Sequence, residues 1–146
     1  MTTITEVLTV EHRVLCELFR HVESLANDAE SVAEIGRWAA LLERLLRNHA
    51  DTENSLAYAA LDHTLAQRGR LKQLFQDHHE IDAALRRVPE ARTPAQARRL
   101  LARALQASRD HFRHEEEQVF PLMQSTLREE TLGRLGQTRL AAPLAA

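Results

Sequence analysis

Apolar residues recur every three or four positions along most of the chain, and this spacing predicts helices rather than strands. Breaks in the pattern fall near Asn27-Asp28, at Gln67-Arg68-Gly69, around Pro89 and at Pro121. The pattern therefore predicts four long helices, at about residues 4–26, 32–62, 70–88 and 94–119, with a shorter helical tail after them.

Three of these helices begin with a capping signal. Thr3-x-x-Glu6, Ser31-x-x-Glu34 and Thr93-Pro94-x-Gln96 each place a side-chain oxygen before the helix and an acid or amide three residues later. Pro94 stands at the first helical position, where its missing N–H group costs nothing. The helix starts are therefore better defined by the sequence than the helix ends.

The inward face of each helix follows from a step of about 100° per residue. The predicted inward residues of the first helix are Leu8, His12, Leu15, Phe19 and Val22, and those of the second are Trp38, Leu42, Leu45, His49, Glu53 and Leu56. Those of the third are Leu71, Leu74, Phe75, His78, Ile81 and Leu85, and those of the fourth are Leu101, Ala104, Ser108, His111, Phe112, Glu115, Val119 and Leu122. The same step places Tyr58 away from the Glu53 side. Every predicted helix thus carries a metal-ligand type of side chain within its apolar stripe.

Two segments combine histidine and glutamate at helical spacing: His49-Ala50-Asp51-Thr52-Glu53 and His111-Phe112-Arg113-His114-Glu115. Four residues make just over one helical turn, so the imidazole and the carboxylate of each step project from the same face. Two such steps, each preceded along the chain by another inward histidine, predict a site for two metal ions within a helical bundle.

The chain also repeats itself. Glu11-His12-Arg13-Val14-Leu15 resembles Asp77-His78-His79-Glu80-Ile81, and each segment is followed by one of the two His-x-x-x-Glu steps. Each half then forms a helical hairpin that provides one histidine from its first helix and a His/Glu pair from its second. Packing the two hairpins antiparallel brings six candidate ligands together: His12, His49, Glu53, His78, His111 and Glu115.

The free-energy cost of burying these imidazoles and carboxylates must be compensated by another interaction. An unpaired buried carboxylate costs several kcal/mol, and a domain has only about 5–15 kcal/mol of net stability. A metal pair bridged by two carboxylates compensates directly, whereas His–Glu hydrogen bonds within each helix are the alternative. Imidazole and carboxylate ligands favour iron, with manganese or zinc as alternatives, and the absence of thiolates argues against a structural zinc cage.

The third helix offers two adjacent histidines as the ligand. His78 lies near the centre of the inward stripe, and the repeat aligns it with His12. His79 is displaced by about 100° and is kept as the alternative to His78. His21 and His63 are expected on the surface.

Composition limits the other functions that the chain could have. The net charge of −2 and the pI of about 6.4 give no reason to expect a nucleic-acid partner. The single cysteine, Cys16, excludes an internal disulfide and fits a reducing compartment. With no signal pattern and no run long enough to span a membrane, the expected location is the cytoplasm. The Glu-x-x-His step of ferritin-like sites is absent from the sequence.

The sequence resembles the hemerythrin-like (HHE cation-binding) domain family. His111-Phe112-Arg113-His114-Glu115-Glu116-Glu117-Gln118-Val119-Phe120-Pro121 matches its second His-x-x-x-Glu-Glu motif, and Glu11-His12 and Asp77-His78 match its acid–His steps. The resemblance implies an all-α, up-down-up-down antiparallel four-helix bundle with a short C-terminal helical tail. It also implies two non-haem iron ions, bridged by Glu53 and Glu115, with His12, His49, His78 and His111 as terminal ligands.

Two residues depart from that family pattern. The oxygen-carrying hemerythrins have a fifth histidine one turn before the third-helix ligand, where this chain has Leu74. One iron would then keep an open or water-filled position. Asn54 stands where relatives often have a second glutamate, so a carboxylate that supports a ligand is expected to be missing there.

We therefore expect a bundle at residues 1–125 and a partly frayed helical tail at 126–146. The first functional hypothesis is a di-iron protein that binds or senses O₂, NO or the iron and redox state. The second is a di-iron oxidoreductase: an oxidase, a peroxidase-like enzyme or an enzyme that handles nitric oxide. A reversible O₂ carrier and a metal-free bundle rank below these. The expected partner is a small diatomic ligand or peroxide, and a protein partner is left unidentified.

Overall fold

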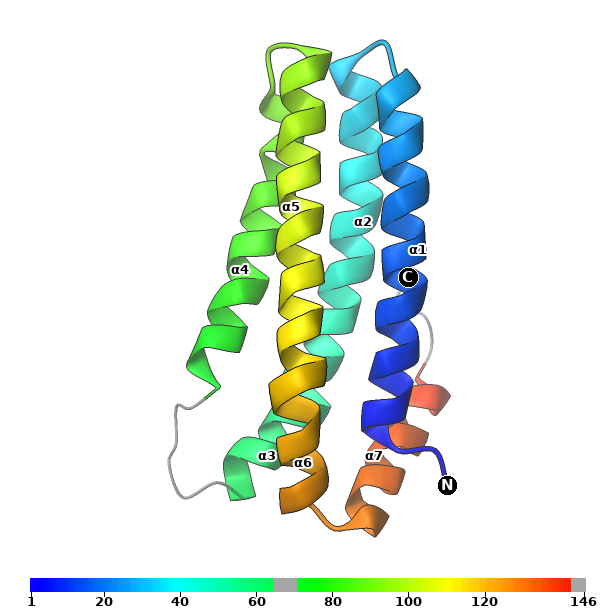
Figure 1. Cartoon of the computed structure of the whole chain (residues 1–146), viewed down its shortest axis with the longest axis vertical. Helices are drawn as coiled ribbons and strands as arrows, with labels where there is room; N and C mark the ends of the chain where they lie inside the picture. Colours follow the sequence, from blue (N-terminus) through cyan, green and yellow to red (C-terminus); the bar gives the residue numbers. More distant parts are fainter. Residues whose placement is uncertain (65–70, 143–146) are drawn as a thin grey trace.

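The structure is a computed structural model, and it describes residues 1–64 and 71–142. Within those ranges the chain is helical and contains no strand. The α-helices are α1 (Ile4–Asp28), α2 (Val32–Thr52), α3 (Ala59–Thr64), α4 (Lys72–Arg86), α5 (Pro94–His114), α6 (Phe120–Thr126) and α7 (Glu129–Ala141). Figure 1 shows the four longest of them, α1, α2, α4 and α5, side by side in a bundle. The predicted break at Gln67-Arg68-Gly69 lies outside the described residues.

All three predicted helix starts are confirmed. The hydroxyl of Thr3 accepts a hydrogen bond from the Glu6 N–H, and the Thr3 N–H donates to the Glu6 carboxylate at 2.8 Å, which completes a capping box. The side chains of Ser31 and Thr93 cap α2 and α5 by accepting from the N–H groups of Glu34 and Gln96, but the return bond that would complete a capping box is not formed at either. These caps satisfy backbone donors that the first turn of a helix leaves free.

Two turns of π-helix interrupt the regular helices, at Glu53–Tyr58 (η1) and Glu115–Val119 (η3). Each begins at the glutamate of a His-x-x-x-Glu step. The predicted break at Pro121 is wrong, because the helix continues through it to Thr126. The Phe120 N–H bonds to the Glu115 carbonyl five residues back, and Pro121, which has no N–H to contribute, follows where the bonding pattern changes.

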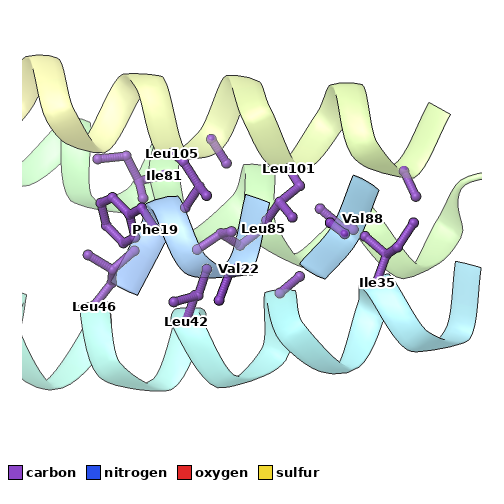
Figure 2. Close-up of a cluster of buried hydrophobic side chains, with 14 of the residues drawn as sticks. Phe19, Val22, Ile35, Leu42, Leu46, Ile81, Leu85, Val88, Leu101 and Leu105 are labelled. Atoms are coloured by element: carbon purple, nitrogen blue, oxygen red, sulfur yellow. The ribbon is translucent and has the colours of Figure 1, made fainter. Parts of the chain in front are cut away.

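The apolar core is divided into two clusters. The larger contains Leu15, Phe19, Leu42, Ile81 and Leu101, among others, and Figure 2 shows how its side chains interdigitate between the helices. The smaller gathers Ile4, Leu8, Tyr58, Leu61, Leu71, Leu74, Phe120, Met123 and Leu132 at the other end of the bundle. Between the two clusters, on each of the four long helices, lies a histidine.

Two predicted inward residues lie near the surface instead. Leu45 is 38% exposed, and Leu46 is buried in its place. These two residues stand at equal angles on either side of the line from Leu42 to His49, so periodicity alone does not choose between them. Phe75 is 37% exposed because it lies at the edge of the α4 stripe.

No helix in residues 1–64 or 71–142 is long and apolar enough to cross a bilayer. The tail predicted after residue 125 is represented by α7, which lies against the N-terminal half of α1 (Figure 1).

Candidate metal centre

The six side chains predicted as ligands converge at the middle of the bundle. Their ligand atoms form two groups, His12, His49, Glu53 and Glu115, and Glu53, His78, His111 and Glu115; within each group all the atoms lie within 4.8 Å of one another. Both carboxylates belong to both groups. The arrangement is therefore that of two adjacent groups of four candidate ligands that share Glu53 and Glu115.

Burial of the cluster is nearly complete. Glu53 and Glu115 are 0% exposed, and His12, His49 and His111 are also buried. The His78 side chain is 11% exposed. Among the described residues, the two apolar clusters lie on either side of the carboxylates and separate them from the ends of the bundle.

Each imidazole uses its Nδ1 atom to bond an oxygen outside the cluster. His12 bonds Glu116 at 2.8 Å, and His49 bonds Glu11 at 2.7 Å. The other two pairs are His78 with the Asn54 side-chain oxygen at 3.2 Å and His111 with Asp77 at 3.1 Å. These oxygens only accept hydrogen bonds, so every Nδ1 carries the proton and every Nε2 keeps its lone pair, unless the ring is doubly protonated.

These outer partners follow the sequence repeat. The acid before each first-helix histidine bonds the histidine of the second helix in the same hairpin: Glu11 with His49, and Asp77 with His111. The residue after each shared glutamate bonds the first-helix histidine of the other hairpin: Glu116 with His12, and Asn54 with His78. The sequence analysis identified the acid–His pairs but did not predict that each acid bonds the histidine of the second helix. The acid that recurs before the first-helix histidine in both halves was the feature that could have indicated this bond.

Asn54 makes the same kind of hydrogen bond as its counterpart Glu116, but its side chain is neutral. No carboxylate stands at this position, as expected, yet the Asn54 amide oxygen takes over the hydrogen bond to His78. A neutral acceptor polarises the imidazole less than a carboxylate does. His78 is therefore the histidine of the cluster with the weakest outer support.

The inner atoms have the spacing of ligands around a metal. His49 Nε2 lies 2.7 Å and His12 Nε2 lies 3.3 Å from Glu53 Oε1, and His12 Nε2 lies 3.3 Å from Glu115 Oε2. Neighbouring ligands at right angles, with metal bonds of about 2.1 Å, are about 3 Å apart. The distances in the cluster are therefore short enough for these atoms to hold a common cation.

Several inner atoms lack a hydrogen bond. His49 Nε2, Glu53 Oε2 and both Glu115 carboxylate oxygens are buried without a partner in hydrogen-bond geometry, despite their short distances to neighbours. Buried polar atoms in folded proteins are nearly always satisfied. Lone pairs that converge without donors need a cation among them, so the residues present fit a pair of metal ions.

In the absence of a metal, protons fill this role. Burial and then the Glu53 carboxylate raise the pKa of Glu115 well above its usual range. Burial opposes ionisation of Glu53 too, but the His49 charge and hydrogen bonds from the imidazoles hold its pKa well below the usual range. Burial disfavours a charged His49, yet Glu53 and the outer carboxylate raise its pKa to about 9. A metal must displace these protons, so metal binding and proton release are coupled.

The comparison with known families agrees with this donor set. The family model described as the hemerythrin HHE cation binding domain matches residues 3–123. The chain belongs to the hemerythrin HHE cation-binding family. Comparisons with curated proteins and with solved structures found no match.

Within this hemerythrin-like domain, the structure separates the two adjacent histidines of α4. His78 belongs to the cluster, with its Nε2 atom 3.0 Å from Glu53 Oε2 and 2.8 Å from His111 Nε2. His79 is exposed and lies outside both ligand groups, although it contributes to the lining of the pocket beside them. His21, His63 and His114 are exposed as well.

Leu74 lies one turn before His78, where the resemblance to the family implies the fifth histidine of the oxygen carriers. It is 3% exposed and packs in the smaller apolar cluster of the hemerythrin-like domain. An aliphatic side chain provides no metal ligand. The two four-ligand groups are accordingly alike in composition, with two imidazoles and two shared carboxylates each.

The prediction that Tyr58 points away from the Glu53 side of its helix is wrong. Its side chain is fully buried, its ring stacks on His78 with centroids 5.9 Å apart, and its hydroxyl has no hydrogen-bond partner. The error comes from the π turn that runs from Glu53 to Tyr58. A π-helix turns less per residue than an α-helix, so a residue five positions on returns toward the same face.

A pocket of about 210 Å³ opens beside the centre, between α2 and α4. His49, His78 and His111 form its inner wall together with Phe112, and its sides include Leu46, Phe75, Ile81 and Leu85. A single water molecule needs only about 10–15 Å³ of cavity volume measured in this way. The pocket is therefore larger than a diatomic ligand requires.

Proposed function

We propose that this hemerythrin-like domain is a non-haem di-iron protein that binds or senses O₂, NO, peroxide or the iron and redox state. The supporting observation is the convergence of four Nε2 atoms on two shared, buried carboxylates, three of whose oxygens have no hydrogen-bond partner. In this proposal Glu53 and Glu115 bridge the ions, His12 and His49 hold one ion, and His78 and His111 hold the other. The up-down-up-down order of the four long helices is part of the same proposal.

Iron is favoured over the alternatives by the number and kind of donors. Each group offers two imidazoles and two carboxylates and no thiolate, a set that suits iron or manganese better than a structural zinc site. When bound, iron would supply redox chemistry and open coordination positions for a small exogenous ligand. The chain's own residues orient the histidines, exclude bulk water and carry the protons that the metal displaces.

The pocket favours a second candidate, a di-iron oxidoreductase. Its volume of about 210 Å³ exceeds the size of O₂ or NO, and three ligand histidines line it. A substrate that enters from the α2–α4 side would therefore approach both four-ligand groups. Oxidase, peroxidase-like and nitric-oxide-handling activities all belong to this candidate.

Metal analysis of the aerobically purified protein tests the proposal. We expect about two iron ions per chain and absorption bands of a coupled di-ferric pair, and we expect both to disappear in Glu53→Ala. A matched control is His21→Ala, which changes an exposed histidine of α1. One zinc ion per chain, or equal metal loss in the His21 variant, would refute the proposal.

The two candidate functions separate in a second measurement. Addition of NO or azide should change the spectrum of the loaded protein in both cases. Turnover of a reducing co-substrate with O₂ or peroxide is expected only for the oxidoreductase. A bulky substitution in the pocket, such as Ile81→Phe, should slow that turnover more than it weakens azide binding.

A further inference from the structure

Helix α7 lies outside the residues that the family model matches, yet it packs tightly on the bundle. Leu132 is buried in the smaller apolar cluster. Gly133 and Gly136 are buried against the N-terminal residues, and a Cβ atom at Gly136 would overlap the Thr2 carbonyl oxygen and lie 2.8 Å from the Thr3 carbonyl carbon. This close contact fixes where the rest of α7 runs along α1.

Arg139, near the end of α7, reaches the outer support of the metal centre. Its Nε atom donates to Glu11 Oε1 at 2.7 Å, and a terminal guanidinium nitrogen donates to the Asn48 side-chain oxygen at 3.1 Å. The other Glu11 oxygen, Oε2, accepts from His49 Nδ1 at 2.7 Å. Arg139 is thus separated from a candidate metal ligand by one carboxylate group.

The two carboxylate oxygens of Glu11 therefore accept hydrogen bonds from different partners. One is held by Arg139 and the other by His49, so the guanidinium selects one rotamer of a side chain that would otherwise sample several. The Arg139 side chain is only 12% exposed, which limits screening by water and salt. Its second bond, to Asn48, fixes it to the residue before His49 on α2.

The other half of the repeat has a weaker arrangement. Asp77 supports His111 as Glu11 supports His49, but its second oxygen accepts from the neutral amide of Gln73 at an exposed position. The supporting acid of the first half is therefore held by a charged, half-buried arginine, whereas the supporting acid of the second half is held by an exposed neutral amide. The asymmetry comes from α7, which has no counterpart in the repeat.

We propose that Arg139 is a positioning residue of the metal centre, which orients His49 through Glu11 and makes α7 a functional part of the metal-binding domain. This inference rests on the proposed function, since His49 is taken as a ligand of one of two ions. It predicts an effect confined to the ion held by His12 and His49. The ion held by His78 and His111 should be unaffected.

The test measures metal release to a chelator in wild type, Arg139→Ala, Arg139→Lys, Glu11→Gln and the double variant Arg139→Ala/Glu11→Gln. Loss of an outer partner of a ligand costs roughly 10–100-fold in metal affinity, and an indirect partner should cost less, roughly three- to tenfold in release rate. We expect that acceleration for one of the two ions in Arg139→Ala, and partial recovery in Arg139→Lys, which keeps one charged donor. The double variant should be no worse than Glu11→Gln alone, because both changes break the same connection.

Arg134→Ala is the matched control, because Arg134 is an exposed arginine on the same helix. Release rates in Arg139→Ala equal to those of this control would overturn the inference. A fall in the melting temperature of Arg139→Ala without any change in metal release would also overturn it, because Arg139 would then only attach α7.

A second readout does not need the metal. In the metal-free protein, exchange of the His49 Nδ1 proton with water, followed by NMR, should be slow in wild type and faster in both Arg139→Ala and Glu11→Gln. Unchanged exchange in Arg139→Ala would contradict the inference. If wild type bound no metal, the proposed function would fail, and this proton would still decide whether Arg139 orients His49.

Discussion

His78 Nε2 lies 2.8 Å from His111 Nε2, although each of these rings directs its Nδ1 atom at an oxygen acceptor. Two neutral rings in this state would point lone pair at lone pair. The contact is stable only with a proton between the nitrogens or with a cation bound by both. This pair therefore shows the requirement for a positive charge more directly than any other contact in the cluster.

The two shared glutamates should respond differently to the loss of charge. Glu115→Gln copies the protonated acid that burial and Glu53 favour, so the metal-free protein should keep nearly its full stability. Glu53→Gln removes the partner of a charged, buried His49 and should destabilise the metal-free protein by roughly 3–5 kcal/mol. Both variants should lose metal. Urea unfolding and metal analysis check this, and an equally stable Glu53→Gln would contradict it.

The adjacent histidines of α4 give a matched pair of variants. His78→Ala should deplete the metal strongly, since it removes a ligand and leaves Glu53 Oε2 without a neighbouring nitrogen. His79→Ala changes an exposed side chain and should leave metal content near that of wild type. Metal analysis of the two variants, purified in parallel, is the measurement. Greater depletion in His79→Ala would show that the α4 register described here is incorrect.

Stability of the metal-free protein should fall as the pH rises from 6.5 through 9. The pKa of His49 is raised from 6.5 to about 9, so its contribution is fully present below pH 6.5 and is lost as the pH rises through 9. The slope for one proton is at most about 1.4 kcal/mol per pH unit. Urea unfolding across this range measures it. His49→Gln should flatten the slope, and greater stability at alkaline pH in the wild type would contradict the assignment.

Below pH 6.5 a second histidine, His111, should make the stability of the metal-free protein change with pH in the opposite direction. Burial and the neighbouring His78 lower the pKa of His111 from 6.5 to about 4, so its contribution is present above pH 6.5 and is lost as the pH falls through 4. The metal-loaded protein should depend on pH differently, because metal binding releases protons and its affinity rises with pH. Metal titrations in two buffers with different ionisation enthalpies would count those protons.

The leucine in place of a fifth histidine predicts how the loaded protein reacts with O₂. Leu74 provides no ligand, so an exchangeable position on iron should admit azide or NO, and the reduced protein should be oxidised rapidly rather than bind O₂ reversibly. The check is to reduce the protein anaerobically, admit O₂ and follow the spectrum. Leu74→His should slow the oxidation, with Leu74→Met as a volume-matched control. A long-lived, reversible oxygenated wild type would return the protein to the carrier class.

Much of the cluster could be predicted from the sequence because its candidate ligands lie in short, repeated segments. A His-x-x-x-Glu step fixes two side chains on one helical face whatever the rest of the chain does. The repeat of acid–His segments then brings in His12 and His78, and both lie in the cluster. The caps at Thr3, Ser31 and Thr93 are equally local signals, which is why the starts of three helices were predicted to the residue.

What the sequence could not show depends on irregular backbone and on distant contacts. A constant step of 100° per residue has no place for the π turn at Glu53, and so it misplaced Tyr58. The break expected at Pro121 is absent because the π turn at Glu115 lets the helix continue through the proline. The choice of Leu46 over Leu45 is made by neighbouring helices. Arg139 meets Glu11 across 128 residues of sequence, and no periodicity predicts such a pair.

The sharing of Glu53 and Glu115 has a consequence for how the protein assembles. Each hairpin holds both histidines of its own four-ligand group but must borrow one carboxylate from the other hairpin. On the proposed function, a single hairpin would therefore be an incomplete chelator, and tight metal capture would have to wait until the two halves have docked. Each captured ion would then cross-link halves that are distant in the chain, so metal loading would stabilise the docked bundle.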